Sequence, residues 1–226
     1  MISNIFRPLQ SKVLKNWKGV RSFAAVGADS TARQQVIEKW LDDIVIKQKL
    51  CPFAPPVRRP PKLRIKILNS NSHDEIVDQM HEEAHLLVGT TDPYTSLHSR
   101  PETTLVVLNE EICTSLTDFR DLVRLSWQVQ EEVINKHSYT HSLQQVLFHP
   151  KATHQTYSEW IEEDAADYTI RSPFPIIHLL REEDVMKAVT SGYKDLENLP
   201  TRNKQRMRKD GLELCMRRLN ECRKVS

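Results

Sequence analysis

The segment "TTLVVLN", residues 103–109, decides the fold. Between Thr104 and Asn109 the side chains are all aliphatic, so polar and apolar positions do not alternate. A short, continuous apolar run of this kind is typical of a strand that is buried on both faces. The segment therefore predicts the central strand of a sheet that helices cover.

Three further strands are expected on either side of this segment. "KLRIKILN", residues 62–69, alternates apolar and basic side chains for most of its length, as a half-exposed strand does. "LQQVLFHP", residues 143–150, and "FPIIHLLR", residues 174–181, follow later in the chain. The four runs predict one sheet, and the segment between the last two is expected to be irregular.

Helices are expected between and around these strands. They should cover residues 31–49, 72 to about 88, a long stretch begun by Ser115 with Asp118, a stretch from 182 onward, and 202–223. The core stripe of the long helix is expected to be Phe119, Leu122, Val123, Trp127 and Ile134. "CPFAPPVRRPP", residues 51–61, should end the first helix and run on as an extended connection, because proline lacks the backbone donor that a helix needs.

Strands that alternate with helices define the fold class as α/β. We expect a single sheet of about four strands with covering helices, plus N- and C-terminal helices, in one domain over residues 31–226. Both a ferredoxin-like and a short doubly wound arrangement fit this order of elements.

The composition is that of an ordinary soluble globular protein. Of the 226 residues, 39% are hydrophobic and 27% are charged, and the formal net charge is +2. No apolar run approaches the roughly 20 residues of a membrane-spanning helix, and the small net charge argues against nucleic acid as a main partner. The four cysteines form no Cys-x-x-Cys pair, which predicts free thiols in a reducing compartment.

The first 28 residues carry no acidic side chain, whereas basic residues recur among Ile, Phe, Leu, Val and Trp. An acid-free amphipathic leader with Arg and Ser is typical of a mitochondrial transit peptide. The Arg21-Ser22-Phe23 sequence resembles a site for the matrix processing peptidase. We therefore expect a mitochondrial matrix protein that is mature from about Ala24; the alternative is a disordered basic tail.

Residues 81–85, His-Glu-Glu-Ala-His, match the H-E-x-x-H pattern of zinc peptidases. The buried stripe of this helix should, however, consist of its apolar residues, which are Ile76, Val77, Met80, Ala84, Leu87 and Val88. His81 and His85 would then lie on the polar flank of the stripe. We expect two solvated histidines here, and we predict no metal and no other cofactor.

Four stretches carry a family resemblance. They are "LCPFA" at 50–54, "FHP" at 148–150, "RSPFPIIHLLRE" at 171–182 and "LPTRNKQRMRKDG" at 199–211. In these motifs the chain resembles the family of proteins of unknown function DUF1415, over roughly residues 34–220. The resemblance implies a fold and candidate positions but no activity. Ile170, where the family usually has Asn, and the altered segment after His149 imply that a pocket there is changed or lost.

Candidate site residues lie near the ends of the last two strands. His149 follows a buried strand, where open α/β sheets place ligands, and could act as an acid or base; the alternative is a histidine bonded to the backbone. Arg171 could hold a carboxylate or phosphate, or pair internally with Glu182. Arg181 and Glu182 sit beside a helix N-terminus that could bind an anion. His178, inside an apolar strand, is either a satisfied core histidine or a supporting ligand.

Cys51 is a candidate nucleophile, with His149 as its base. Its place at a helix C-terminus should raise the pKa of the thiol, because the negative end of the helix dipole disfavours a thiolate. A structural turn that packs Cys51 and Phe53 into the core is the favoured interpretation.

The sequence leaves two functions open. The first is a mitochondrial matrix protein that binds a small anionic ligand, a carboxylate or a phosphate, with His149 as acid or base if it is an enzyme. The second is a non-catalytic assembly factor or accessory subunit, which would contact an acidic protein or RNA through the basic residues of 202–218.

Overall fold

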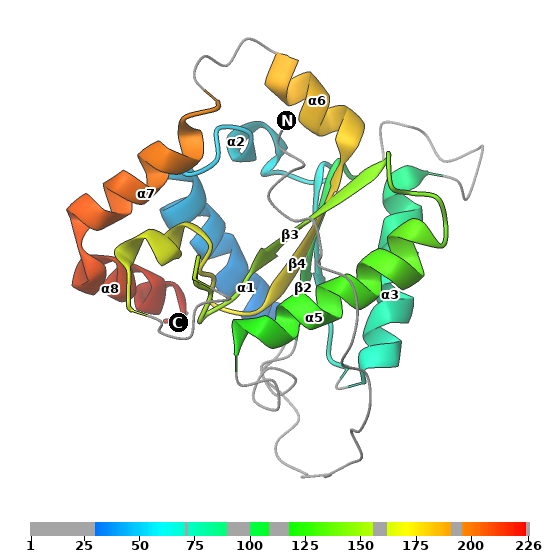
Figure 1. Cartoon of the computed structure of the whole chain (residues 1–226), viewed down its shortest axis with the longest axis horizontal. Helices are drawn as coiled ribbons and strands as arrows, with labels where there is room; N and C mark the ends of the chain where they lie inside the picture. The colour runs from blue at the N-terminus through cyan, green and yellow to red at the C-terminus, as the bar shows by residue number, and fades with distance from the viewer. Residues whose placement is uncertain are drawn as a thin grey trace.

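The computed structural model describes residues 30–70, 72–89, 100–108, 118–155, 162–190 and 196–224 (Figure 1). The predicted transit peptide therefore lies outside the described residues. Within the described ranges, no helix combines the length and the apolar character needed to cross a membrane.

Four strands form one mixed sheet. They are β1 (Leu63–Ile67), β2 (Thr103–Val107), β3 (Leu143–Phe148) and β4 (Ile176–Arg181), in the spatial order β1-β2-β4-β3. β1 runs parallel to β2, and β4 pairs antiparallel with both β2 and β3. The three strands β1, β2 and β3 therefore point the same way, and β4 is inserted between two of them in the opposite direction.

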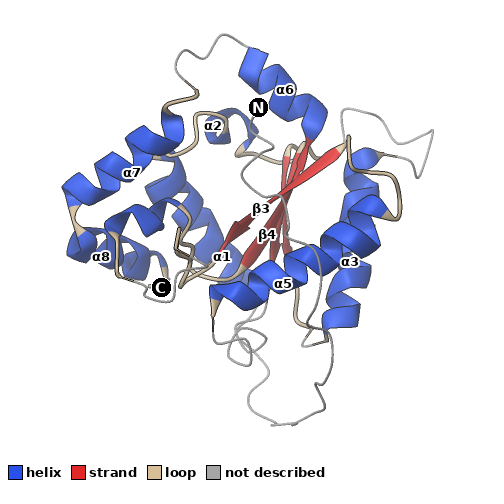
Figure 2. Ribbon diagram, viewed as in Figure 1, coloured by secondary structure: helices blue, strands red, loops and turns tan. Residues whose placement is uncertain are grey.

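The expected α/β fold with a four-stranded sheet is confirmed. Helices cover both faces of the sheet, as in a doubly wound arrangement, with α3 and α5 on one side and α1, α7 and α8 on the other (Figures 1 and 2). The antiparallel strand β4 departs from a purely parallel doubly wound sheet. All five residues of β2 are buried, as the run at 103–109 predicts.

The first face carries α3 (His73–Val88) and α5 (Phe119–Val129), which continues as a π-helix, η3 (Gln130–Asn135). The α3 side chains that the sequence places in the core are buried, with Val88 partly so. The N-cap of α5 is Asp118, whose carboxylate accepts the Arg120 N–H, and Ser115 lies outside the described residues. The expected burial of Trp127 was wrong, because this residue is 41% exposed. The stripe passes instead through Leu125, Ser126 and Val129, because a straight 3.6-residue repeat rotates Trp127 away from the sheet.

The second face carries α1 (Ser30–Trp40), which continues as a π-helix, η2 (Leu41–Ile46). Ile37 and Trp40 pack with Leu105, Val107 and Ile176 of the sheet. The helix α8 (Leu212–Cys222) closes the same cluster with its buried residues.

The C-terminal region forms two helices where the sequence predicts one. α7 (Leu199–Asp210) ends and α8 begins at Gly211, which has φ +84° and ψ 157°. This backbone conformation is open to glycine and costly for other residues, so the helix breaks there. α7 packs on η4 (Ala165–Thr169), a short 3-10 helix in the irregular segment before β4.

Two short elements lie near the end of the sheet where β4 finishes (Figure 1). α2 (Ala54–Val57) is a single helical turn in a stretch expected to be extended, a conformation that Pro55 and Pro56 tolerate in a first turn. α6 (Glu182–Thr190) follows β4 directly and has three acidic residues in its first turn, as expected. These two elements and η2 leave part of the second sheet face uncovered.

Candidate functional site

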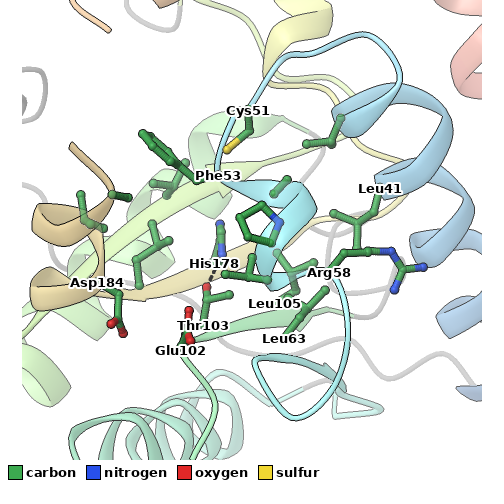
Figure 3. Close-up of a pocket in the computed structure, with 18 of the residues that line it drawn as sticks. Leu41, Cys51, Phe53, Arg58, Leu63, Glu102, Thr103, Leu105, His178 and Asp184 are labelled. Carbon is green, nitrogen blue, oxygen red and sulfur yellow. Dashed lines mark hydrogen bonds between the residues drawn. The ribbon is translucent and has the colours of Figure 1, made fainter. Parts of the chain in front are cut away.

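The uncovered part of the sheet is the floor of a cavity of about 650 Å³. The floor comes from β2, β4 and β3, and the walls come from η2, the turn before α2, α2 itself, and α6 (Figure 3). This size falls in the range of sites that bind small molecules and cofactors.

The floor is a grid of cross-strand neighbours. Its central row is formed by Leu105, His178 and Val146, which are paired directly across β2, β4 and β3. One row further on, Leu180 lies between Thr103 and Gln144. Side chains two residues apart on a strand share a face, so this register places His178 in the middle of the floor with mainly aliphatic neighbours.

His178 forms a hydrogen bond with Thr103, its diagonal neighbour on β2. Its Nε2 lies 2.5 Å from Thr103 Oγ1, and the Thr103 hydroxyl donates to the Leu179 carbonyl over 2.8 Å. A hydroxyl has a single proton, so a Thr103 that donates to Leu179 can only accept from the ring, and we assign the Nε2–H tautomer to His178 on this basis. Figure 3 shows the imidazole standing between Thr103 and the Cys51 side of the pocket.

The hydrogen bonds fix the state of the other ring nitrogen. Burial lowers the pKa of His178 to about 4, so the ring is neutral near pH 7 and carries one proton. The bond to Thr103 assigns that proton to Nε2, which leaves Nδ1 as the acceptor of the ring. The pocket floor thus offers one imidazole lone pair inside an apolar surface.

Cys51 contributes to the wall rather than to the core. Burial raises the pKa of the Cys51 thiol, although hydrogen bonds from the backbone around Phe53 and Ala54 partly oppose this. The direction agrees with the sequence prediction, but the largest cause is burial and not the helix dipole. A thiol with a raised pKa is a poor nucleophile, which favours a structural role.

Aromatic rings close the lower end of the pocket. Phe148 meets Trp40 edge-on, with ring centroids 5.3 Å apart, and lies 6.2 Å from the His178 ring. The Trp40 indole N–H donates to the Arg171 carbonyl over 3.2 Å, which fixes the ring. The Trp40–Phe148 contact therefore joins α1 to the end of β3.

The charged residues around the opening are paired with one another. Arg58 binds both carboxylate oxygens of Asp42, at 2.7 and 2.9 Å. Arg181 Nε donates to Asp184 over 2.5 Å. Lys62 pairs with Glu102 at 2.9 Å. Each of these cations therefore has an acidic partner beside it, which weakens its attraction for an anionic ligand.

The wall that carries Cys51 is tied to α7. The buried Asn203 donates from Nδ2 to the Leu50 carbonyl over 2.7 Å, and Arg206 donates to the Gln48 carbonyl. These bonds satisfy carbonyl groups of the turn that follows η2. The "LCPFA" and "LPTRNKQRMRKDG" motifs are therefore in direct contact.

His149 lies at the opposite end of the sheet from Arg181. It is 3% exposed, and its Nδ1 accepts the Lys151 N–H over 3.0 Å. Burial, with a smaller contribution from Lys151, lowers the pKa of His149 to about 4. Its Nε2 has no hydrogen-bond partner among the described residues. This geometry matches the alternative of a strand terminus bonded to the backbone.

Arg171 lies near His149 and is engaged internally. Its Nε donates to the Ala152 carbonyl over 3.1 Å, its guanidinium lies 4.6 Å above the Tyr168 ring, and it faces Asp167 at 3.9 Å. The sequence left open an internal pair with Glu182, but Glu182 accepts a hydrogen bond from Gln144 instead.

The structure therefore divides the predicted site into two regions. His149 and Arg171 lie at the end where β4 begins, and Arg181 and Glu182 at the end where it finishes, roughly 17 Å away at about 3.3 Å per residue. His178 and Arg181 line the pocket. Sequence reasoning missed three pocket residues, Thr103, Gln144 and Val146. Gln144 and Val146 are two residues apart in "LQQVLF", and this spacing, which places them on one face of the strand, was the available signal.

The His-Glu-Glu-Ala-His stretch has other contacts. His81 stacks on His137 with centroids 4.0 Å apart, and His85 Nδ1 lies 3.0 Å from the Tyr139 hydroxyl. Glu83, which is 3% exposed, binds Arg64 through both oxygens at 2.8 and 3.0 Å. In the part of the chain that the structure describes, no three His, Cys, Asp or Glu side chains are arranged to hold a metal ion.

Several cations of the C-terminal region serve the fold. Arg208 pairs with Asp164 at 2.6 Å, and Arg218 pairs with Asp210. The ion pair with Arg208 lowers the pKa of Asp164 to about 2. Other cations of this region are exposed, and they are Arg202, Lys209 and Arg217.

Together these features define an α/β protein with an apolar pocket on one sheet face and a neutral histidine in the pocket floor. The chain belongs to the family described as protein of unknown function (DUF1415), whose model matches residues 32–217. No significant match is found among curated proteins or among solved structures.

Proposed function

We propose that this protein binds a small, largely apolar molecule in the pocket over β2, β4 and β3. The observation that carries the proposal is the 650 Å³ cavity with His178 in its floor. A cavity this large, lined by aliphatic and aromatic side chains around a few polar groups, is the usual form of a small-molecule site.

The charges around the pocket favour this ligand over the carboxylate or phosphate expected from Arg171 and Arg181. Both guanidinium groups already face acidic side chains, Asp167 and Asp184. The neutral His178 ring presents a lone pair, which repels an anion. A neutral ligand meets neither obstacle.

Binding also fits the site better than acid–base catalysis. Efficient catalytic groups have pKa values near the working pH, and the pKa of His178 is about 4. Protonating a base with a pKa of about 4 at pH 7 costs about 4 kcal/mol of free energy, because the two values are about three units apart. His178 is therefore better suited to orient a bound molecule.

The test is a thermal-shift screen of neutral metabolites on the mature protein, repeated with Ala188→Trp. Ala188 lines the pocket, so an indole there should fill it and abolish the shifts. Met186→Trp is the matched control, because Met186 is 50% exposed on the same helix and is not among the lining residues. Equal ligand responses in all three proteins would contradict the proposal.

We further propose that the protein works in the mitochondrial matrix, which the acid-free leader of residues 1–28 supports. Fluorescent fusions test this. The full chain should enter mitochondria, and a chain that begins at Ala24 should stay in the cytosol. Cytosolic location of both would refute it.

The docking alternative predicts a different result. The exposed cations Arg202, Lys209 and Arg217 would contact an acidic partner, so reversing them to Glu should release the protein from a large assembly. Native gel filtration of mitochondrial extract distinguishes the two functions. A small native mass that is unchanged by the reversal favours the binding protein.

A further inference from the structure

We infer that the pocket selects ligands that carry a hydroxyl or N–H donor on an apolar body, and that the Thr103–His178 pair sets this polarity. This inference rests on the proposed function and adds the chemical class of the ligand to it.

The first step is the proton of Thr103. The residue is 4% exposed, and its hydroxyl donates to the Leu179 carbonyl over 2.8 Å. A carbonyl oxygen can only accept, so this contact uses the single proton of the hydroxyl. Thr103 can then only accept from the ring 2.5 Å away.

The second step is the proton of His178. A neutral imidazole has one N–H. Because Thr103 can only accept a hydrogen bond from the ring, that N–H is assigned to Nε2. Nδ1 therefore presents a lone pair to the pocket. A donor on the ligand completes the chain from ligand to His178, Thr103 and Leu179, whereas an ether or carbonyl oxygen would face lone pair against lone pair.

The third step concerns the other polar groups of the pocket. The amide of Gln144 donates to Glu182, and Arg58 donates to Asp42. The thiol of Cys51 is a weak donor. A guanidinium has five N–H donors and an amide has two, so these groups keep donors of their own beside the pocket. At the centre of the floor, where the direct neighbours of the ring are Leu105 and Val146, Nδ1 is the polar atom, and a donor on the ligand matches it.

The experiment uses two pairs of probes that differ by one methyl group. These are 2-naphthol with 2-methoxynaphthalene, and indole with 1-methylindole. Calorimetric titration of the mature protein should show that the donor in each pair binds about three- to tenfold more tightly, the factor expected of one net hydrogen bond. His178→Phe should remove the difference while keeping the apolar floor.

Thr103 supplies matched variants. Thr103→Ser keeps the hydroxyl and should keep the donor preference. Thr103→Val keeps the shape but removes the acceptor for Nε2–H, so the preference should shrink. The 15N spectrum of the ring gives a second readout: Nδ1 should be pyridine-like and Nε2 pyrrole-like in the protein and in Thr103→Ser.

The outcomes separate the two proposals. Saturable binding with equal affinity within each pair, or tighter binding of the methylated members, contradicts the inference and leaves the proposed function standing. Absence of saturable binding by all four probes contradicts both. A protonated or pyridine-like Nε2 in the spectrum overturns the inference independently of any ligand.

Discussion

Thr103 Oγ1 lies 2.5 Å from His178 Nε2, and the two residues are diagonal neighbours on the antiparallel strands β2 and β4. The contact joins the end of the buried strand "TTLVV" to the histidine in the pocket floor. It holds a neutral ring in one orientation on a rigid sheet, which is the precondition for recognising a ligand by a single hydrogen bond.

Acidification should destabilise the protein through His149, which is buried, and His178, which lies half-buried in the pocket floor. The folded-state pKa values of His178 and His149 are about 4, below the ordinary 6.5, so the unfolded chain binds more protons between these values. The stability they contribute is complete above pH 6.5 and is lost as the pH falls towards 4. Because a pKa shift of one unit corresponds to 1.36 kcal/mol, each histidine accounts for a loss of up to about 3 kcal/mol of unfolding free energy.

The measurement is urea unfolding at a series of pH values between 7 and 4. His178→Phe should show a smaller loss of unfolding free energy on acidification than the wild type, because one buried base has been removed. His141→Phe is the control, since His141 is exposed. Parallel curves for the wild type and His178→Phe would show that the ring is not neutral and buried in the folded protein.

Asn203→Ala should weaken both the fold and the pocket. The variant leaves the Leu50 carbonyl without its side-chain donor, a loss of about 1–2 kcal/mol of unfolding free energy. Because Leu50 precedes Cys51 in the pocket wall, ligand affinity should fall as well. Arg202→Ala, at the exposed neighbouring position, should change neither quantity by more than about 0.5 kcal/mol.

Gly211→Ala should destabilise the protein by about 1–3 kcal/mol, because φ +84° with ψ 157° is costly for any residue with a Cβ. The added methyl meets nothing within 4 Å, so the cost is one of backbone strain and not of packing. Thermal unfolding measures it, with Lys209→Ala as the control. A stabilised Gly211→Ala protein would indicate that α7 and α8 form one continuous helix.

Sequence periodicity predicted the elements correctly where burial of apolar side chains alone decides the structure. The strand at 103–107 and the buried stripe of α3 were predicted because burial requires apolar side chains at fixed spacings. Trp127 was misplaced because a large aromatic residue was taken as core, although the repeat turns it outward. The break at Gly211 had a visible signal, since glycine ends helices, but the apolar repeat continued across it.

The pocket depends on facts that periodicity does not contain. His149 and Arg181 looked close because each ends a strand, but the antiparallel direction of β4 separates them by the length of the sheet. His178 could be identified as a histidine on an apolar strand. Its partner Thr103 is 75 residues away, and only the register of β2 with β4 brings the two together.

The most direct test of the binding site is the 15N imidazole spectrum of the mature protein during titration with 2-naphthol. We predict that the His178 Nδ1 resonance shifts and saturates as it accepts the ligand hydroxyl, while the resonances of His149, at the other end of the sheet, stay in place. Saturable binding that leaves His178 unmoved, or that shifts His149 instead, would contradict the assignment of this pocket.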